Sequence, residues 1–152
     1  MAVTRVCVVG PPGVDLRAEL LSYETAREAL STYALATPWE NAVAVETVSV
    51  GTAVSLLNDL DWYLVRVADD AIVFEPSVSG DEWLSRTLAT AIRDGNVDPG
   101  ETGSYLKLYG VDEGELVEPL YTRRIGETLP EYDLRDVEET VPVRVTESEF
   151  GG

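Results

Sequence analysis

Short apolar segments of strand length alternate along this chain with segments of helical periodicity, and this order limits the fold more than any other feature. The strand-like segments are rich in β-branched residues and lie at residues 3–9, 42–50, 62–67, 71–75, 104–110, 115–125 and 141–145. Helical patterns lie between them, at residues 15–32, 52–60 and 82–95. The order is therefore β-α-β-α-β-β-α-β, followed by further extended segments.

This order predicts a single α+β (or α/β) domain in which helices pack on one mixed β-sheet. A ferredoxin-like arrangement is compatible with it. The 152 residues suit one domain, and the hydrophobic share of 45% suffices for a sizeable core. We expect residues 1–126 to form this domain. Residues 127–152 are then an acidic C-terminal extension with an edge strand at 141–145, packed on the same domain.

Two local patterns in the middle of the chain make specific predictions. Residues 62–67 and 71–75 have the composition of a β-hairpin that turns at Asp69-Asp70. The sequence Ser79-Gly80-Asp81-Glu82 matches a capping box, which predicts that a helix begins there and ends near Gly95.

A turn and a helix follow the first strand. The sequence Gly10-Pro11-Pro12-Gly13 lies where a phosphate-binding loop would lie. It lacks the residues of either common phosphate-binding motif, its prolines have no N–H to donate, and Asp15 would repel an anion, so we interpret it as a plain turn. Asp15 can cap the helical segment 15–32. The apolar face of that segment shifts near Ser22, which leaves one bent helix or two as alternatives.

The polar composition excludes several classes of function. The chain has no histidine and one cysteine, so it has no histidine-based nucleophile or metal ligand, no disulfide framework and no zinc finger. Its 28 acidic and 11 basic residues give a net charge of −17, which argues against a protein that grips phosphate backbones. We therefore predict no catalytic set of a common type, no cofactor and no metal site.

The distribution of charge indicates a habitat. Residues 1–76 carry 11 acidic residues and residues 77–152 carry 17, and ten of the 11 basic residues are arginine. A dispersed acidic surface with almost no lysine is typical of halophilic proteins in a salt-filled cytoplasm, where the Debye length is only about 3 Å at 1 M salt. The chain shows neither a signal peptide nor a transmembrane segment, so we expect a cytoplasmic protein.

Two sequence strings are similar to a known family. They are VSVGTAVSLLNDLDWYLVR at residues 48–66 and PSVSGDEWLSR at residues 76–86. Both resemble a family of short, acidic haloarchaeal proteins known only as a domain of unknown function. The resemblance implies a halophilic archaeal source, and it supplies no reaction, ligand or catalytic residue.

One group of residues is explained less well by habitat than the rest. If segments 104–110 and 115–125 pair as antiparallel strands, alternation places three tyrosines, the only lysine and one or two arginines on one face. We call these six residues the Tyr/Arg cluster: Tyr105, Lys107, Tyr109, Tyr121, Arg123 and Arg124. Such a surface could stack a base or an aromatic ligand, or receive an acidic partner. The alternative is a structural ladder in which the arginines pair with Glu115 or Glu118.

Other candidate residues have simpler explanations. Cys7 lies inside an apolar strand and is interpreted as a buried core residue. Asp59, Asp61 and the Asp69-Asp70 pair offer oxygen ligands to a divalent cation, but they are interpreted as solvated acids and turn formers. Trp39 is either an anchor for a partner or, as we expect, a residue that closes one end of the core.

These observations favour a non-enzymatic binding or regulatory module that acts through protein–protein contacts, as a homodimer or with a protein partner. The alternative is a small carboxylate-based enzyme, dependent on a divalent metal in one version. It would require a deep pocket in which two carboxylates converge with Arg66, Arg123 or Lys107. Binding of a nucleotide or RNA by the Tyr/Arg cluster ranks lowest.

Overall fold

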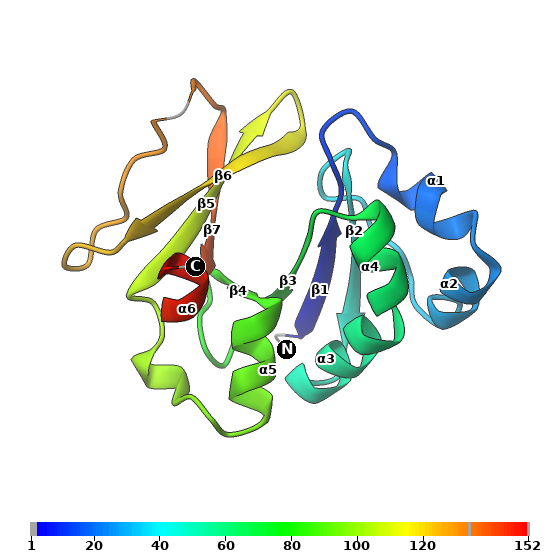
Figure 1. Ribbon diagram of the computed structural model, residues 1–152, viewed down its shortest axis with the longest axis horizontal. Coiled ribbons are helices and arrows are strands. Elements are labelled where there is room, and N and C mark those ends of the chain that lie inside the picture. The colour runs from blue at the N-terminus through cyan, green and yellow to red at the C-terminus, as the bar shows by residue number, and fades with distance from the viewer. Residues whose placement is uncertain (1–2, 134, 152) are drawn as a thin grey trace.

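One seven-stranded sheet organises the chain, in the order β2-β1-β3-β4-β7-β5-β6 (Figure 1). This computed structural model describes residues 3–133 and 135–151. Among the described strands only β4 and β7 run parallel, and all other neighbours are antiparallel. The strands are β1 (Thr4–Val9), β2 (Ala42–Thr47), β3 (Asp70–Phe74), β4 (Trp83–Ser85), β5 (Tyr105–Asp112), β6 (Glu115–Arg123) and β7 (Glu139–Arg144).

Helices cover one face of the β1–β3 half of the sheet, and Figure 1 shows α1 to α4 gathered on that side. Apolar side chains of β1, β2 and β3 pack there against leucines such as Leu20 and Leu57. The helices are α1 (Leu16–Leu21), α2 (Glu24–Ala29), α3 (Val50–Asp59), α4 (Asp61–Val67), α5 (Arg86–Arg93) and α6 (Glu147–Gly151), with a short 3₁₀ turn at Pro99–Glu101.

The other face of β1–β3 packs against the second half of the sheet. Cys7 and Ile72 from the first half share a buried apolar cluster with Val111, Leu116 and Val143 from the second half. The sheet is therefore bent, and its two edge strands, β2 and β6, both contribute side chains to this second core.

Asn41 links the two halves of the bent sheet through buried hydrogen bonds. Its side-chain amide donates to the carbonyl oxygens of Gly10 and Leu116, at 2.9 Å each, and its Oδ1 accepts from the Leu116 N–H, also at 2.9 Å. The residue is fully buried. It thus joins the end of β1 to the start of β6, and the cleft described below opens between these two regions.

The α+β class with a mixed sheet in a single domain is confirmed. Residues 15–32 form two helices, α1 and α2, and Asp15 caps the first by accepting from the Ala18 N–H at 3.1 Å. The ferredoxin-like arrangement is not the one formed, because β1 and β2 are adjacent and antiparallel across their helical connection.

The predicted hairpin of 62–67 with 71–75 is wrong in its first strand, which is helix α4. Tyr63 and Leu64 are buried while Trp62, Val65 and Arg66 are exposed, which is a helical period rather than a strand alternation. The Arg66 guanidinium lies 3.8 Å from the centroid of the Trp62 ring, one helical turn away. The content of β-forming residues misled the prediction because packing against α1 decides the conformation here.

The helix predicted to begin at the Ser79–Glu82 capping box begins later. Ser79 Oγ accepts from the N–H groups of Asp81 and Glu82, but it caps only a turn. Residues 83–85 then form β4, and α5 begins at Arg86 with Ser85 as its N-cap. Pairing of β4 with β3 and β7 overrides the local signal.

The segment at 141–145 is not an edge strand, because β7 lies between β4 and β5. The expected edge position of 115–125 is confirmed, since β6 ends the sheet. Pro119 falls at an irregularity in the pairing of β5 with β6, where a missing N–H donor is tolerated. The division at residue 126 stays a prediction.

Candidate binding site

A cleft of about 670 Å³ opens between the two halves of the bent sheet. Most of its walls come from the end of β1, the start of β3, and the strands β5 and β6, and the segment before β7 and helix α6 add one residue each, Arg135 and Glu149. We call this the central cleft, and its polar lining includes Asp69, Asp70, Lys107, Tyr109, Tyr121 and Glu118. Its volume lies in the range of small-molecule sites, which is roughly 300–1,000 Å³.

A buried polar network forms one wall of the central cleft. Lys107 Nζ donates to Asp70 Oδ2, and the Tyr109 hydroxyl donates to the same oxygen at 2.5 Å. Asp70 Oδ1 accepts from the Ala71 N–H at 2.9 Å. Lys107 and Tyr109 are each 5% exposed. Burying an ammonium group costs free energy unless it is paired, and Asp70 provides that pairing.

Burial, reinforced by the neighbouring charge of Asp70 and the hydrogen bond to it, raises the pKa of Tyr109 far above its usual value. The phenol therefore keeps its proton at all ordinary pH values and acts as a donor. A tyrosine held in this way orients Asp70 and is unsuited to act as a base.

The structure brings three of the six Tyr/Arg cluster residues to the central cleft: Lys107, Tyr109 and Tyr121. The antiparallel pairing of β5 with β6 sets Lys107 opposite Tyr121 and Tyr105 opposite Arg123. The Tyr105 ring packs on Phe150, and the Arg123 guanidinium lies 5.4 Å from the centroid of the Tyr105 ring. Tyr105 and Arg123 therefore form a separate stack beside the cleft.

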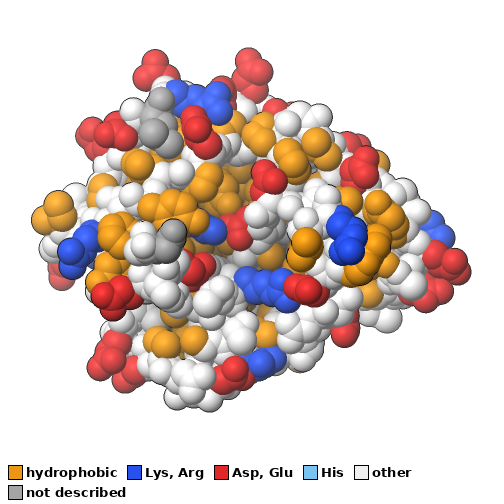
Figure 2. Space-filling model, in the orientation of Figure 1, with side chains coloured by type: hydrophobic (Ala, Val, Ile, Leu, Met, Phe, Trp, Pro, Cys, Tyr) orange, Lys and Arg blue, Asp and Glu red, His pale blue; other side chains and the backbone are white. Residues whose placement is uncertain are grey.

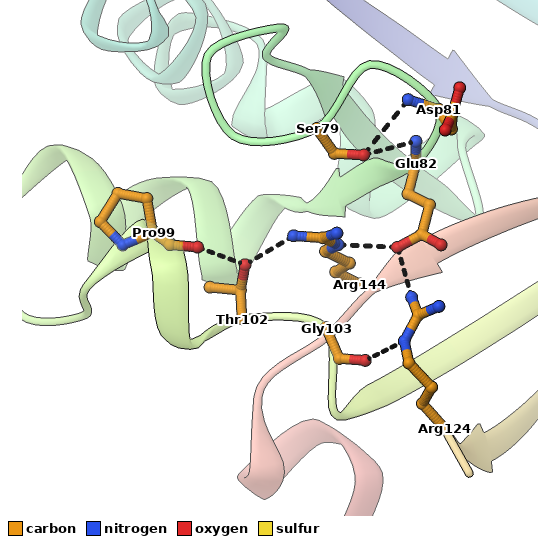
Figure 3. Close-up of polar contacts among 8 residues, drawn as sticks. All are labelled: Ser79, Asp81, Glu82, Pro99, Thr102, Gly103, Arg124 and Arg144. Atoms are coloured by element: carbon orange, nitrogen blue, oxygen red, sulfur yellow. Dashed lines mark hydrogen bonds and ion pairs between the residues drawn. The ribbon is translucent and has the colours of Figure 1, made fainter. Parts of the chain in front are cut away.

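Arg124 is held elsewhere, by the Glu82 carboxylate (Figure 3). Glu82 Oε1 accepts from Arg124 Nη2 at 2.5 Å and from Arg144 Nε at 2.7 Å. The Arg124 guanidinium also donates to the Gly103 carbonyl, and the Arg144 guanidinium donates to the Thr102 hydroxyl. These contacts connect the ends of β6 and β7 to the loop before β4, which holds Glu82, and to the loop before β5. Burial alone would raise the pKa of Glu82, but the hydrogen bonds and charges of the two arginines outweigh it and lower that pKa. This arrangement is a structural clamp, and it withdraws Arg124 from the predicted surface.

Sequence reasoning did not identify the partners that matter most. The sequence pattern predicts a turn former at Asp70 and a capping residue at Glu82, and no local pattern distinguishes Asn41 from other loop residues. Each of the three forms hydrogen bonds with residues that lie at least 31 positions away in the sequence. Only the alternation of Lys107 and Tyr109 along a strand could have signalled the cleft.

Other candidates fall where their simpler explanations placed them. Cys7 is fully buried, and burial first, with Asp70 second, raises the pKa of its thiol to about 12. The Gly13 N–H donates to the Glu115 carboxylate at 2.5 Å, so this loop does not offer that donor to a phosphate. Trp39 packs on the second core, with its ring 6.3 Å from that of Trp83. Asp61 pairs with Arg86 at 2.8 Å.

Acidic side chains are scattered over the face of the molecule in Figure 2 and do not gather into one patch. Among the described residues, no three Asp, Glu or Cys side chains cluster as the ligands of a metal ion would. Within the same part of the chain, none of the helices has the length and apolar character needed to cross a membrane.

Comparison with known proteins identifies a family but no function. Residues 4–111, more than half of the chain, match the model of a family described as "Family of unknown function (DUF5804)". No curated protein matches, and no solved structure matches.

Proposed function

This chain belongs to DUF5804, a family of unknown function, so its role has to be argued from its own residues, and we propose that it is a non-enzymatic binding module. Lys107 carries this proposal. It is the only lysine in 152 residues, and it is buried in the wall of an open cleft rather than exposed on the surface. A paired lysine and a proton-holding tyrosine provide fixed recognition groups in a site of small-molecule size.

We propose that the module acts through contacts with a protein, either a second copy of itself or another partner, along β6. This strand ends the sheet and borders the cleft. Near its end, Tyr121 is 45% exposed and Ile125 is 80% exposed. Exposed sheet edges pair readily with other chains, and apolar side chains beside the edge strengthen such contacts.

Light scattering after size exclusion in molar KCl tests this contact. We expect a species heavier than the 16.6 kDa monomer, formed alone or after mixing with the partner. The substitution Ile125→Glu should abolish it, because it buries a charge in the contact. Val48→Glu is the matched control, since Val48 is 91% exposed on the connection between β2 and α3. A monomer in every condition, with no cross-link formed from position 121, would refute the contact.

A small carboxylate-based enzyme is the second candidate, favoured by one specific observation. Asp69, Asp70, Glu118 and Glu149 all line the cleft that contains Lys107. If a divalent cation served such an enzyme, Mn²⁺ would broaden the amide signals of Asp69 and Asp70 at micromolar concentration. Broadening that is uniform over the whole acidic surface would speak against it.

Nucleotide or RNA binding is the least supported alternative. The Tyr/Arg cluster that would carry it is divided, because Arg124 pairs with Glu82 and Lys107 pairs with Asp70.

We also propose that the protein works in a halophilic cytoplasm, on the basis of its charge of −17.

A further inference from the structure

Lys107 has hydrogen-bonding capacity that the protein leaves unused. An ammonium group has three N–H donors. Asp70 takes one of them, and no other described residue accepts from Lys107 Nζ. The side chain is 6% exposed, so the remaining donors have little access to bulk water. Because buried donors without acceptors are costly, an acceptor oxygen, from water or from a bound molecule, has to reach Lys107 inside the central cleft.

The charge of the lining restricts which molecule can bring that oxygen. Four carboxylates stand against two cations, which leaves an excess of two negative charges: Asp69, Asp70, Glu118 and Glu149 against Lys107 and Arg135. Arg135 lies 4.0 Å from Glu118 and is already shared with Asp112. A phosphate or a carboxylate would therefore meet net repulsion, in addition to the repulsion from a protein of charge −17.

A simple cation also fits poorly. It would satisfy the acidic side chains but would face the ammonium of Lys107 and leave its donors without an acceptor. A hydroxyl group both donates and accepts, so it can serve Lys107 and the carboxylates together. Pro119 and the half-exposed ring of Tyr121 add an apolar surface to the same lining.

We propose that the central cleft binds a small, neutral, polyhydroxylated molecule of the sugar or cyclic-polyol class. Lys107 donates to one of its oxygens, Asp69 and Glu118 accept from its hydroxyls, and Tyr121 packs against its C–H face. This inference rests on the proposed function that the protein is a binding module. It adds the chemical class of the ligand and a recognition mode that salt does not screen, because the ligand is uncharged.

The test is a titration of the ¹⁵N-labelled protein, followed by NMR, with three kinds of probe. The neutral probes are trehalose and myo-inositol, the cationic probe is spermidine, and the anionic probes are phosphate and citrate. We expect the neutral probes to shift the amide signals of Lys107, Tyr109 and Tyr121 saturably. Their affinity should stay the same within about twofold between roughly 0.5 and 3 M KCl, since salt screens only charged groups.

Variants connect the binding to the proposed groups. Lys107→Met should weaken the affinity for the neutral probe by about tenfold or more, since a hydrogen bond from a charged donor is lost. Because this change leaves Asp70 unpaired, the double variant Lys107→Met/Asp70→Asn keeps the wall neutral and provides the same readout if the single variant unfolds. Tyr121→Ala, at an exposed site, should weaken binding several-fold. Arg17 lies in a different surface hollow, so Arg17→Ala should not change the affinity for the neutral probe.

The outcomes separate the two proposals. If spermidine, phosphate or citrate shifts the cleft signals and the neutral probes do not, the ligand class is wrong while the binding module stands. If no probe shifts the cleft signals, the proposed ligand is refuted, and the β6 contact is then judged by light scattering alone. Neutral probes that bind equally to the Lys107 and Tyr121 variants would also overturn the inference.

Discussion

Asn41 is a buried side chain that links two distant parts of the sheet. Its three hydrogen bonds join Gly10 to Leu116 and so connect the two halves of the bent sheet. Removing the amide leaves three buried backbone groups without their partner. Such groups cost more than the average hydrogen bond is worth, because they lose water without gaining a substitute.

We therefore expect Asn41→Ala to lower the free energy of unfolding by about 2–4 kcal/mol. Urea denaturation followed by tryptophan fluorescence measures this change. Asn96→Ala is the matched control, because Asn96 is exposed and should cost little. Equal stabilities of the two variants would show that the Asn41 contacts do not hold the bend.

Gly110 is required for a different reason, the close approach of another segment. A Cβ atom at this position would lie 2.5 Å from Val137 Cγ1 and 2.9 Å from Tyr132 Cζ. We expect Gly110→Ala to displace the segment that holds Tyr132 and Val137 from β5 and to destabilise the fold by about 1–3 kcal/mol. Faster proteolysis within that segment would reveal the displacement. Gly80→Ala, where a Cβ meets nothing within 4 Å, should leave both properties unchanged, and a Gly110 variant that behaves like it would contradict the packing.

At the scale of elements, the Glu82 clamp joins β6 and β7 to the loops before β4 and β5. Its contribution to stability depends on pH. The pKa of Glu82 is lower in the folded protein than its ordinary value of 4.5, so the unfolded chain takes up the proton first as the pH falls. The stabilisation is complete above that ordinary value and disappears as the pH falls through the lower, folded value.

We expect the wild-type protein to lose stability below about pH 4.5 more steeply than Glu82→Gln, which has no proton to take up at this site. Thermal melts across this acidic window measure the slope. Glu24→Gln, at an exposed position of α2, should keep the wild-type slope. If Glu82→Gln keeps it as well, the clamp does not control the acid sensitivity.

Elements that are specified locally could be predicted from the sequence, and elements that depend on distant contacts could not. Strands β1, β2 and β5 follow from β-branched and apolar runs between turns, and α1 follows from its Asp15 cap. The local pattern predicts a strand where α4 forms and a helix start where β4 forms, because packing against α1 and pairing with β7 decide these two elements.

The candidate site divides in the same way. Alternation along β5 is a local property, so the shared face of Lys107 and Tyr109 could be predicted, as could the antiparallel partner that brings Tyr121. The pairing of Lys107 with Asp70 spans 37 residues, and that of Arg124 with Glu82 spans 42. No spacing rule connects such positions, so the sequence predicts one continuous surface of tyrosine, lysine and arginine where the fold forms a cleft and a separate ion-pair cluster.

At the scale of the whole molecule, the charge of −17 is a background that the fold has to tolerate. Dispersed carboxylates repel one another in the compact state, and salt screens that repulsion. We expect the melting temperature to rise when KCl increases from about 0.1 to about 3 M, by roughly 2–4 °C for each 1 kcal/mol of repulsion relieved. Calorimetry measures the shift. A melting temperature that stays constant or falls would contradict the proposed halophilic habitat.

The same composition offers a direct view of the site, because a chain with one lysine gives one lysine side-chain signal. The central claim is that the Lys107 ammonium faces the central cleft and donates to a ligand oxygen there. Labelling with ¹⁵N-lysine and titrating with trehalose measures this at the donor itself. We predict that the single ammonium signal shifts saturably in the wild-type protein and much less in Tyr121→Ala. An ammonium signal that stays fixed at saturating trehalose would contradict the claim.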